Sequence, residues 1–73
     1  MGQAIVDQEK LGIEIRKFLK KVGITSQREI ENAIREKVEN GKLQGVDSLP
    51  SRMILQIPDL GLEYTIDSDI ELH

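Results

Sequence analysis

The chain has 73 residues, of which 38% are hydrophobic and 32% are charged, and its formal net charge at pH 7 is −3. A chain this short buries only roughly 60% of its unfolded surface, which argues against a large enclosed active-site cavity. The sequence contains no cysteine, so it has no disulfide, no thiolate metal site and no cysteine nucleophile.

Residues 1–7 show no periodic pattern, and we expect them to be frayed apart from Asp7, which can cap a following helix. That helix should extend from about Gln8 to Val22. Its apolar residues recur at the spacing of one helical face. They are Leu11, Ile15, Phe18, Leu19 and Val22. Ile13 lies off this face, which makes it either a candidate for contact with a partner or an ordinary exposed aliphatic residue.

The next segment predicts a corner between two helices. Gly23 can end the first helix, because glycine adopts the left-handed conformation without a steric penalty. Ser26 can begin the second, with Glu29 completing a capping box. The second helix should extend from about Gln27 to Asn40, where the dipeptide Asn40-Gly41 ends it. Its apolar residues are Ile30, Ala33, Ile34 and Val38.

The side-chain period changes from 3.6 to 2 after a predicted loop from Lys42 to Pro50. A strand is predicted from about Arg52 to Ile57, and Pro58-Asp59-Leu60-Gly61 is typical of a turn. A second strand begins at Leu62. The segment Asp67-Ser68-Asp69 either continues this strand, bends it or separates it from a third short strand.

These elements predict a single small α+β domain over residues 1–73. In it, a two-helix corner packs on one face of a β-hairpin or of a three-stranded antiparallel meander, and Phe18 and Ile34 face a shared core. No apolar run approaches the roughly 20 residues of a membrane-spanning helix, and no secretory signal is recognisable. We therefore expect a cytoplasmic protein with no membrane partner.

Few residues are suited to catalysis. The single histidine is the last residue, His73, and Ser26 is better explained as a helix cap than as a nucleophile. The pattern D-x-D-x-E at Asp67, Asp69 and Glu71 is similar to part of a calcium loop but lacks its glycine, so we interpret it as the solvated face of a strand. We expect no enzyme, no catalytic residue, no metal site and no cofactor.

Two features predict a protein partner, including a homodimer as one form. A hairpin leaves at least one free strand edge. Ile54 points away from Met53, Leu55 and Ile57, which places an apolar residue on the solvent side. A lone exposed aliphatic residue is equally common, so both interpretations of Ile54 stay open.

An alternative is a winged-helix-like nucleic-acid-binding module, in which two helices form a helix-turn-helix and the hairpin forms a wing. Its contact residues would be Lys17, Lys20, Lys21, Arg28 and Arg35. The charge distribution opposes this alternative, since residues 51–73 carry one basic and five acidic side chains where a wing should be basic.

The string RKFLKKVGITSQREIE at residues 16–31, with GKL, SLP, IPDLGL and IDSDIEL further along, is similar to a family of short bacterial proteins of uncharacterised function. The similarity covers nearly the whole chain after Asp7. It implies a small stand-alone domain in a bacterial cytoplasm, and it implies no catalytic or binding residue. We therefore expect a small soluble domain that acts by contact with an unknown protein partner.

Overall fold

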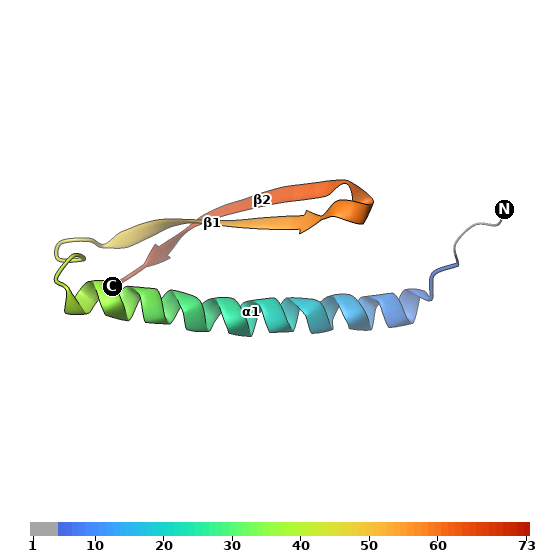
Figure 1. The fold of residues 1–73 in the computed structure, drawn as a ribbon, viewed down its shortest axis with the longest axis horizontal. Coiled ribbons are helices and arrows are strands. Elements are labelled where there is room, and N and C mark those ends of the chain that lie inside the picture. Colours follow the sequence, from blue (N-terminus) through green and yellow to red (C-terminus); the bar gives the residue numbers. More distant parts are fainter. Residues whose placement is uncertain (1–4) are drawn as a thin grey trace. The chain divides into compact units, whose positions relative to one another are not determined.

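The computed structural model describes residues 5–73 and contains one long helix followed by a two-stranded antiparallel hairpin (Figure 1). Helix α1 spans Gln8–Glu39, strand β1 spans Ser48–Ile57 and strand β2 spans Leu62–Glu71. The short 3₁₀ helix η1, Pro58–Leu60, connects the two strands. The predicted α+β class is confirmed, but the prediction of two helices is wrong, and so is the alternative of three strands.

The chain divides into two compact units, one that ends at Lys42 and one that spans Leu43–His73. The first unit contains α1, and the second contains the hairpin. The assignment of both to a single domain stays a prediction. Within the described residues, α1 does not combine the length and the apolar character that a membrane-spanning helix requires.

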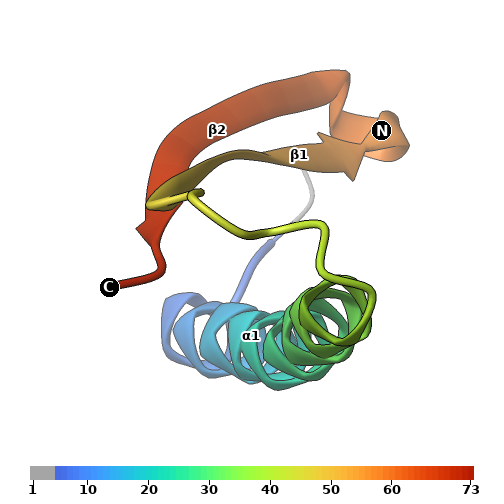
Figure 2. The ribbon, with the colours of Figure 1, turned by 90° about the vertical axis from the view of Figure 1, so that its left-hand side faces the viewer.

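Helix α1 continues through Gly23 and Ser26 without a break (Figure 2). The predicted corner is therefore wrong, and Ser26 is not a helix cap. Leu11, Val22 and Ala33 are spaced by eleven residues, or three helical turns, so these three residues lie on one side of the continuous helix. Ile34 and Val38, two other residues of the second predicted apolar face, lie further around the helix. A glycine inside a helix costs about 1 kcal/mol relative to alanine, and a break would expose several unpaired backbone groups.

The predicted N-terminal end of the helix is confirmed at Asp7. One side-chain oxygen of Asp7, Oδ1, accepts hydrogen bonds from the backbone N–H groups of Glu9 and Lys10, each at 3.1 Å. Two of the four free N–H groups of the first turn are thereby satisfied.

The predicted C-terminal end is confirmed at Asn40-Gly41. Gly41 has φ of 70°, the left-handed conformation that glycine adopts most readily. The N–H of Gly41 donates to the carbonyl of Val38, and the N–H of Lys42 donates to the carbonyl of Lys37, both at 3.0 Å. This pair of bonds is a Schellman motif, and it ends the helix sharply.

The two strands pair over ten positions, from Ser48 opposite Glu71 to Ile57 opposite Leu62. Strand β1 begins four residues before the predicted Arg52, so the last part of the predicted loop is strand. Strand β2 continues through residues 67–69, which decides the open question in favour of a continuous strand. The predicted turn is confirmed, since Gly61 has φ of 62° and its N–H donates to the carbonyl of Pro58 at 3.0 Å.

The position of Pro50 within β1 is compatible with its missing backbone N–H. The N–H of Leu72 donates to the carbonyl of Asp47 at 2.8 Å, and these two residues continue the strand register by one position. Because hydrogen-bonded pairs alternate with non-bonded pairs in an antiparallel ladder, Pro50 and Asp69 form a non-bonded pair. The Pro50 nitrogen therefore faces the free edge of β1, where its missing N–H breaks no ladder bond.

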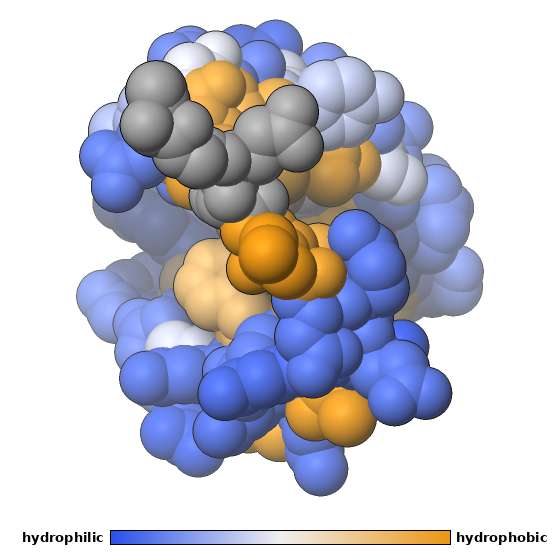
Figure 3. All heavy atoms as spheres, turned by 90° about the vertical axis from the view of Figure 1, so that its right-hand side faces the viewer, coloured by the Kyte–Doolittle hydropathy of each residue, from blue (hydrophilic) through white to orange (hydrophobic). Residues whose placement is uncertain are grey.

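No side chain is buried anywhere in residues 5–73. Phe18 is 52% exposed, and Ile34 is half-buried. Figure 3 shows hydrophobic side chains in orange at the surface, among hydrophilic ones in blue. The expected core around Phe18 and Ile34 is therefore wrong for the described residues, since neither side chain is buried.

Candidate interaction surfaces

One face of the hairpin is predominantly apolar. Strict alternation places every second residue of each strand on this face, and the register sets apolar residues directly opposite one another in four pairs. The apolar hairpin face consists of Leu49, Met53, Leu55, Ile57, Leu62, Tyr64, Ile66 and Ile70, with Ser51 opposite Ser68. Such cross-strand pairs each contribute roughly 0.2–1 kcal/mol to hairpin stability.

Several side chains of the apolar hairpin face are exposed. Tyr64 is 60% exposed, Ile66 is 51% exposed and Met53 is 41% exposed, whereas Leu55 is half-buried. A two-stranded hairpin is at best marginally stable alone in water, because it has no second layer over its apolar side. Contact with another apolar surface would therefore stabilise the apolar hairpin face.

The opposite face of the hairpin is polar and acidic. Arg52 and Asp67 are directly opposite there, and Arg52 Nε lies 2.8 Å from Asp67 Oδ1. Asp69 and Glu71 share this face, as the strand interpretation of the D-x-D-x-E pattern predicted. In the part of the chain that the structure describes, no group of three or more acidic or histidine side chains is arranged to hold a metal ion.

Ile54 lies on the polar face opposite Thr65 and is 55% exposed. Its predicted orientation, away from Met53, is therefore confirmed. Its apolar side chain has only polar or charged neighbours on the facing strand. Its role in contact with a partner stays a prediction.

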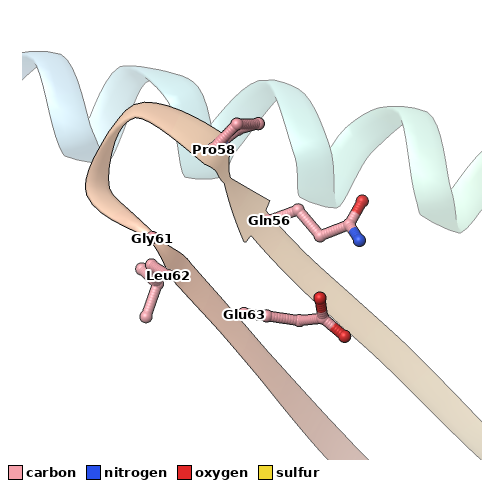
Figure 4. A pocket seen from close by; sticks show the side chains of 5 residues that line it. All are labelled: Gln56, Pro58, Gly61, Leu62 and Glu63. Atoms are coloured by element: carbon pink, nitrogen blue, oxygen red, sulfur yellow. The ribbon is translucent and has the colours of Figure 1, made fainter.

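A hollow of about 310 Å³ lies at the end of the hairpin and is lined by Gln56, Pro58, Gly61, Leu62 and Glu63. Figure 4 shows Gln56 and Glu63 extending from neighbouring strands, where the register sets them directly opposite each other. Glu63 is the single ionisable group among these lining residues. The lining therefore offers no pair of groups for acid-base chemistry.

The continuous helix gives α1 one stripe of mainly apolar side chains, although Glu29 falls within its arc and Ile34 and Val38 lie outside it. At about 100° per residue, its members fall within an arc of about 120°. The helix stripe consists of Leu11, Ile15, Phe18, Leu19, Val22, Ser26, Ile30 and Ala33. Phe18 and Leu19 are 52% and 54% exposed, and Val22, Ser26 and Ile30 are half-buried.

Continuity also aligns basic residues that the two-helix interpretation had separated. Five of them fall within an arc of about 40° on the side of α1 away from the helix stripe. This basic ridge consists of Lys10, Lys17, Lys21, Arg28 and Arg35. Acidic residues adjoin it, and Lys17 Nζ lies 3.9 Å from Glu14 Oε2.

The structure thus brings together four of the five residues proposed for nucleic-acid contact. The fifth, Lys20, lies about 60° or more around the helix from the ridge. Ile13, the second candidate for partner contact, is 56% exposed and lies off the helix stripe. The signal that sequence reasoning missed is the eleven-residue spacing across Gly23, which would have revealed both the stripe and the ridge.

A family model described as "Family of unknown function (DUF6494)" matches residues 6–73. The chain belongs to this family. The resemblance read from the sequence is confirmed as membership of a family of unknown function, and DUF6494 membership assigns no activity to any residue. No curated protein and no solved structure shows significant similarity to this DUF6494 member.

Proposed function

We propose that this protein acts by protein–protein contact through the apolar hairpin face, with a second copy of the chain as its first partner. The observation that carries the proposal is the apolar hairpin face itself, on which eight of ten side chains are apolar. Within residues 5–73 no side chain is buried. An apolar surface of this kind is stabilised when a partner removes it from water.

A second copy suits this surface because it brings an identical apolar face. Two copies related by a twofold axis can bury the same patch on each side, as most soluble homodimers do. The hairpin's charges do not oppose this arrangement, since its acidic residues Glu63, Asp67, Asp69 and Glu71 lie on the opposite face. Contact through the apolar face is therefore better supported than contact through the Ile54 face.

Sedimentation velocity over a wide range of concentrations tests the proposal. We compare the unmodified chain with Met53→Asp and with the matched control Ile54→Asp. Met53 and Ile54 are neighbours on opposite faces of β1, so both variants add the same charge at nearly the same point of the strand. Circular dichroism verifies that both variants keep their secondary structure.

We expect the unmodified chain to be dimeric at high concentration. Met53→Asp should raise the dissociation constant by about a hundredfold or more, because an unpaired carboxylate at an apolar contact costs several kcal/mol. Ile54→Asp should leave the dissociation constant unchanged. A strictly monomeric chain at every concentration would contradict the proposal, and a dimer broken by Ile54→Asp alone would place the contact on the polar face.

The basic ridge supports a second candidate, binding of a polyanion such as duplex nucleic acid. The ridge sets five cations along about 38 Å of one helix, and phosphate attraction supplies most non-specific affinity. A titration with a labelled random duplex at low salt tests this candidate. Lys21→Glu should weaken binding more than the control Lys20→Glu, which changes the net charge equally off the ridge. Absence of binding at low salt would eliminate the candidate.

A further inference from the structure

The outer edge of β2 carries a row of unpaired backbone groups. The described residues form a two-stranded sheet, in which β2 has β1 as its one neighbour. In an antiparallel ladder, the residues of non-bonded pairs turn their N–H and C=O groups away from the facing strand. The register places five residues of β2 in such pairs. This acidic edge consists of Glu63, Thr65, Asp67, Asp69 and Glu71.

The acidic edge offers the full hydrogen-bonding pattern of a strand. None of its five residues is a proline, so each has both a backbone donor and a backbone acceptor. Every residue of β2 from Leu62 to Asp69 is exposed. The outer edge of β1 differs, because Pro50 lies in it and has no N–H group. A strand added to the hairpin therefore forms its regular ladder more readily on β2 than on β1.

The side chains of the acidic edge favour a basic partner. Four of the five are carboxylates, and all five lie on the polar face of the hairpin. Arg52 contacts one of them, Asp67, but the Asp67 side chain is still 62% exposed. An added strand places its side chains about 4.5–5.5 Å from those directly opposite. Lysine or arginine at these positions is attracted to the carboxylates, whereas aspartate or glutamate is repelled.

The other face of β2 favours apolar residues in the same partner. Tyr64 and Ile66 alternate with residues of the acidic edge and point to the apolar hairpin face. Their side chains are 60% and 51% exposed. Every second residue of an added strand lies beside them and removes part of their surface from water. A partner strand therefore needs basic residues on one face and apolar residues on the other.

We infer that the acidic edge binds, by strand addition, an extended segment of another protein in which basic residues alternate with apolar ones. A second copy does not fit, since pairing of two acidic edges sets carboxylates beside carboxylates. The chain itself contains no stretch in which three basic residues alternate with apolar ones. The acidic edge is distinct from the apolar hairpin face, so this inference does not depend on the proposed self-association.

Fluorescence anisotropy with labelled peptides tests the inference. The probe is a peptide of about nine residues, the length from Glu63 to Glu71, in which lysine alternates with valine. One control peptide carries glutamate in place of lysine. Another carries the same lysines and valines in two separate blocks, which keeps the charge but removes the alternation that gives a strand two different faces.

Two matched pairs of variants locate the binding. Thr65→Pro and Ile54→Pro remove the outward N–H groups of two residues that lie directly opposite each other, one on each outer edge of the hairpin. Asp69→Lys and Glu36→Lys change the net charge equally, the first on the acidic edge and the second on α1. Circular dichroism verifies that all four variants keep their secondary structure.

We expect the alternating lysine peptide to bind at low salt with a dissociation constant at least about tenfold below that of either control peptide. Thr65→Pro and Asp69→Lys should each raise this dissociation constant by about tenfold, because a backbone hydrogen bond or a charge pair is lost. Ile54→Pro and Glu36→Lys should change it by less than about twofold.

Amide hydrogen exchange provides a second readout. The outward N–H groups of Thr65, Asp67 and Asp69 should exchange rapidly in the free chain and at least about tenfold more slowly with the peptide bound. Binding without this protection, equal binding of the block peptide, or no binding at low salt would each overturn the inference. Peptide binding to a strictly monomeric chain would support it while contradicting the proposed function. A dimer that binds no peptide would do the reverse.

Discussion

Arg52 Nε donates a hydrogen bond to Asp67 Oδ1 at 2.8 Å, directly across the hairpin on its polar face. Arg52 is the single basic residue of the two strands, and it meets one of their four acidic residues. A register slip of one residue would move Asp67 out of line and would also turn the apolar residues to the opposite face. The ion pair and the apolar pattern therefore favour the same register.

We predict that this ion pair contributes little to stability. Both side chains are more than half exposed, and exposed ion pairs contribute about 0–1 kcal/mol. Arg52→Ala and Asp67→Asn should each lower the free energy of unfolding by no more than about 1 kcal/mol, and less at high salt. Urea unfolding at two salt concentrations measures this change. A loss well above that value would mean that the pair holds the register alone.

A second prediction compares the real cap of α1 with the one suggested by its sequence. Asp7→Ala should cost about 0.5–2 kcal/mol, because two backbone N–H groups lose their acceptor. Ser26→Ala should be neutral or stabilising by up to about 0.5 kcal/mol, since alanine is the better residue inside a helix. Helicity and thermal unfolding provide the measurement. A cost of about 1 kcal/mol for Ser26→Ala would indicate a helix start there.

A third prediction compares two glycines. No atom lies within 4 Å of a Cβ added at Gly23, which is inside α1, so Gly23→Ala should stabilise the helix by up to about 1 kcal/mol. Gly41 is equally open but has φ of +70°, which is unfavourable for alanine by about 1 kcal/mol. Gly41→Ala should therefore destabilise the chain. Equal effects of the two substitutions would contradict the continuous helix.

A fourth prediction concerns neighbouring positions of β2. Ser68 is opposite Ser51 in a hydrogen-bonded pair, whereas Asp69 is opposite Pro50 in a non-bonded pair. Ser68→Pro should therefore remove a ladder bond and cost at least about 1 kcal/mol, and Asp69→Pro should cost less. Amide exchange and urea unfolding measure both effects. Equal costs would show that β2 is not paired as a continuous strand.

Much of the fold follows from local sequence signals. Both ends of α1 were predicted from Asp7 and from Asn40-Gly41, and the turn was predicted from Pro58 to Gly61. Each of these signals agrees with the side-chain period of the helix or strands next to it. The corner at Gly23 and Ser26 was mispredicted because each of those signals is worth only about 1 kcal/mol. The backbone hydrogen bonds that a continuous helix keeps across the glycine outweigh them.

The candidate surfaces were only partly predictable. Alternation along β1 predicted that Ile54 and Met53 point to opposite faces, which the register confirms. The alignment of Lys17 with Arg28 depends on the helix being continuous, so it could not follow from a two-helix interpretation. The start of β1 was missed because Pro50 is typical of a loop, and its tolerance in a strand depends on which edge of the hairpin is free.

The proline in β1 also has a consequence for aggregation. An exposed strand edge invites other chains to extend the sheet, and repeated extension produces amyloid fibrils. Pro50 removes one backbone donor from the outer edge of β1. Asp67 and Asp69 place negative charges along β2, and these would be repelled by the same charges of a second copy paired at that edge. The hairpin can thus present its apolar face to a partner, while both of its strand edges disfavour the repeated sheet extension that produces fibrils.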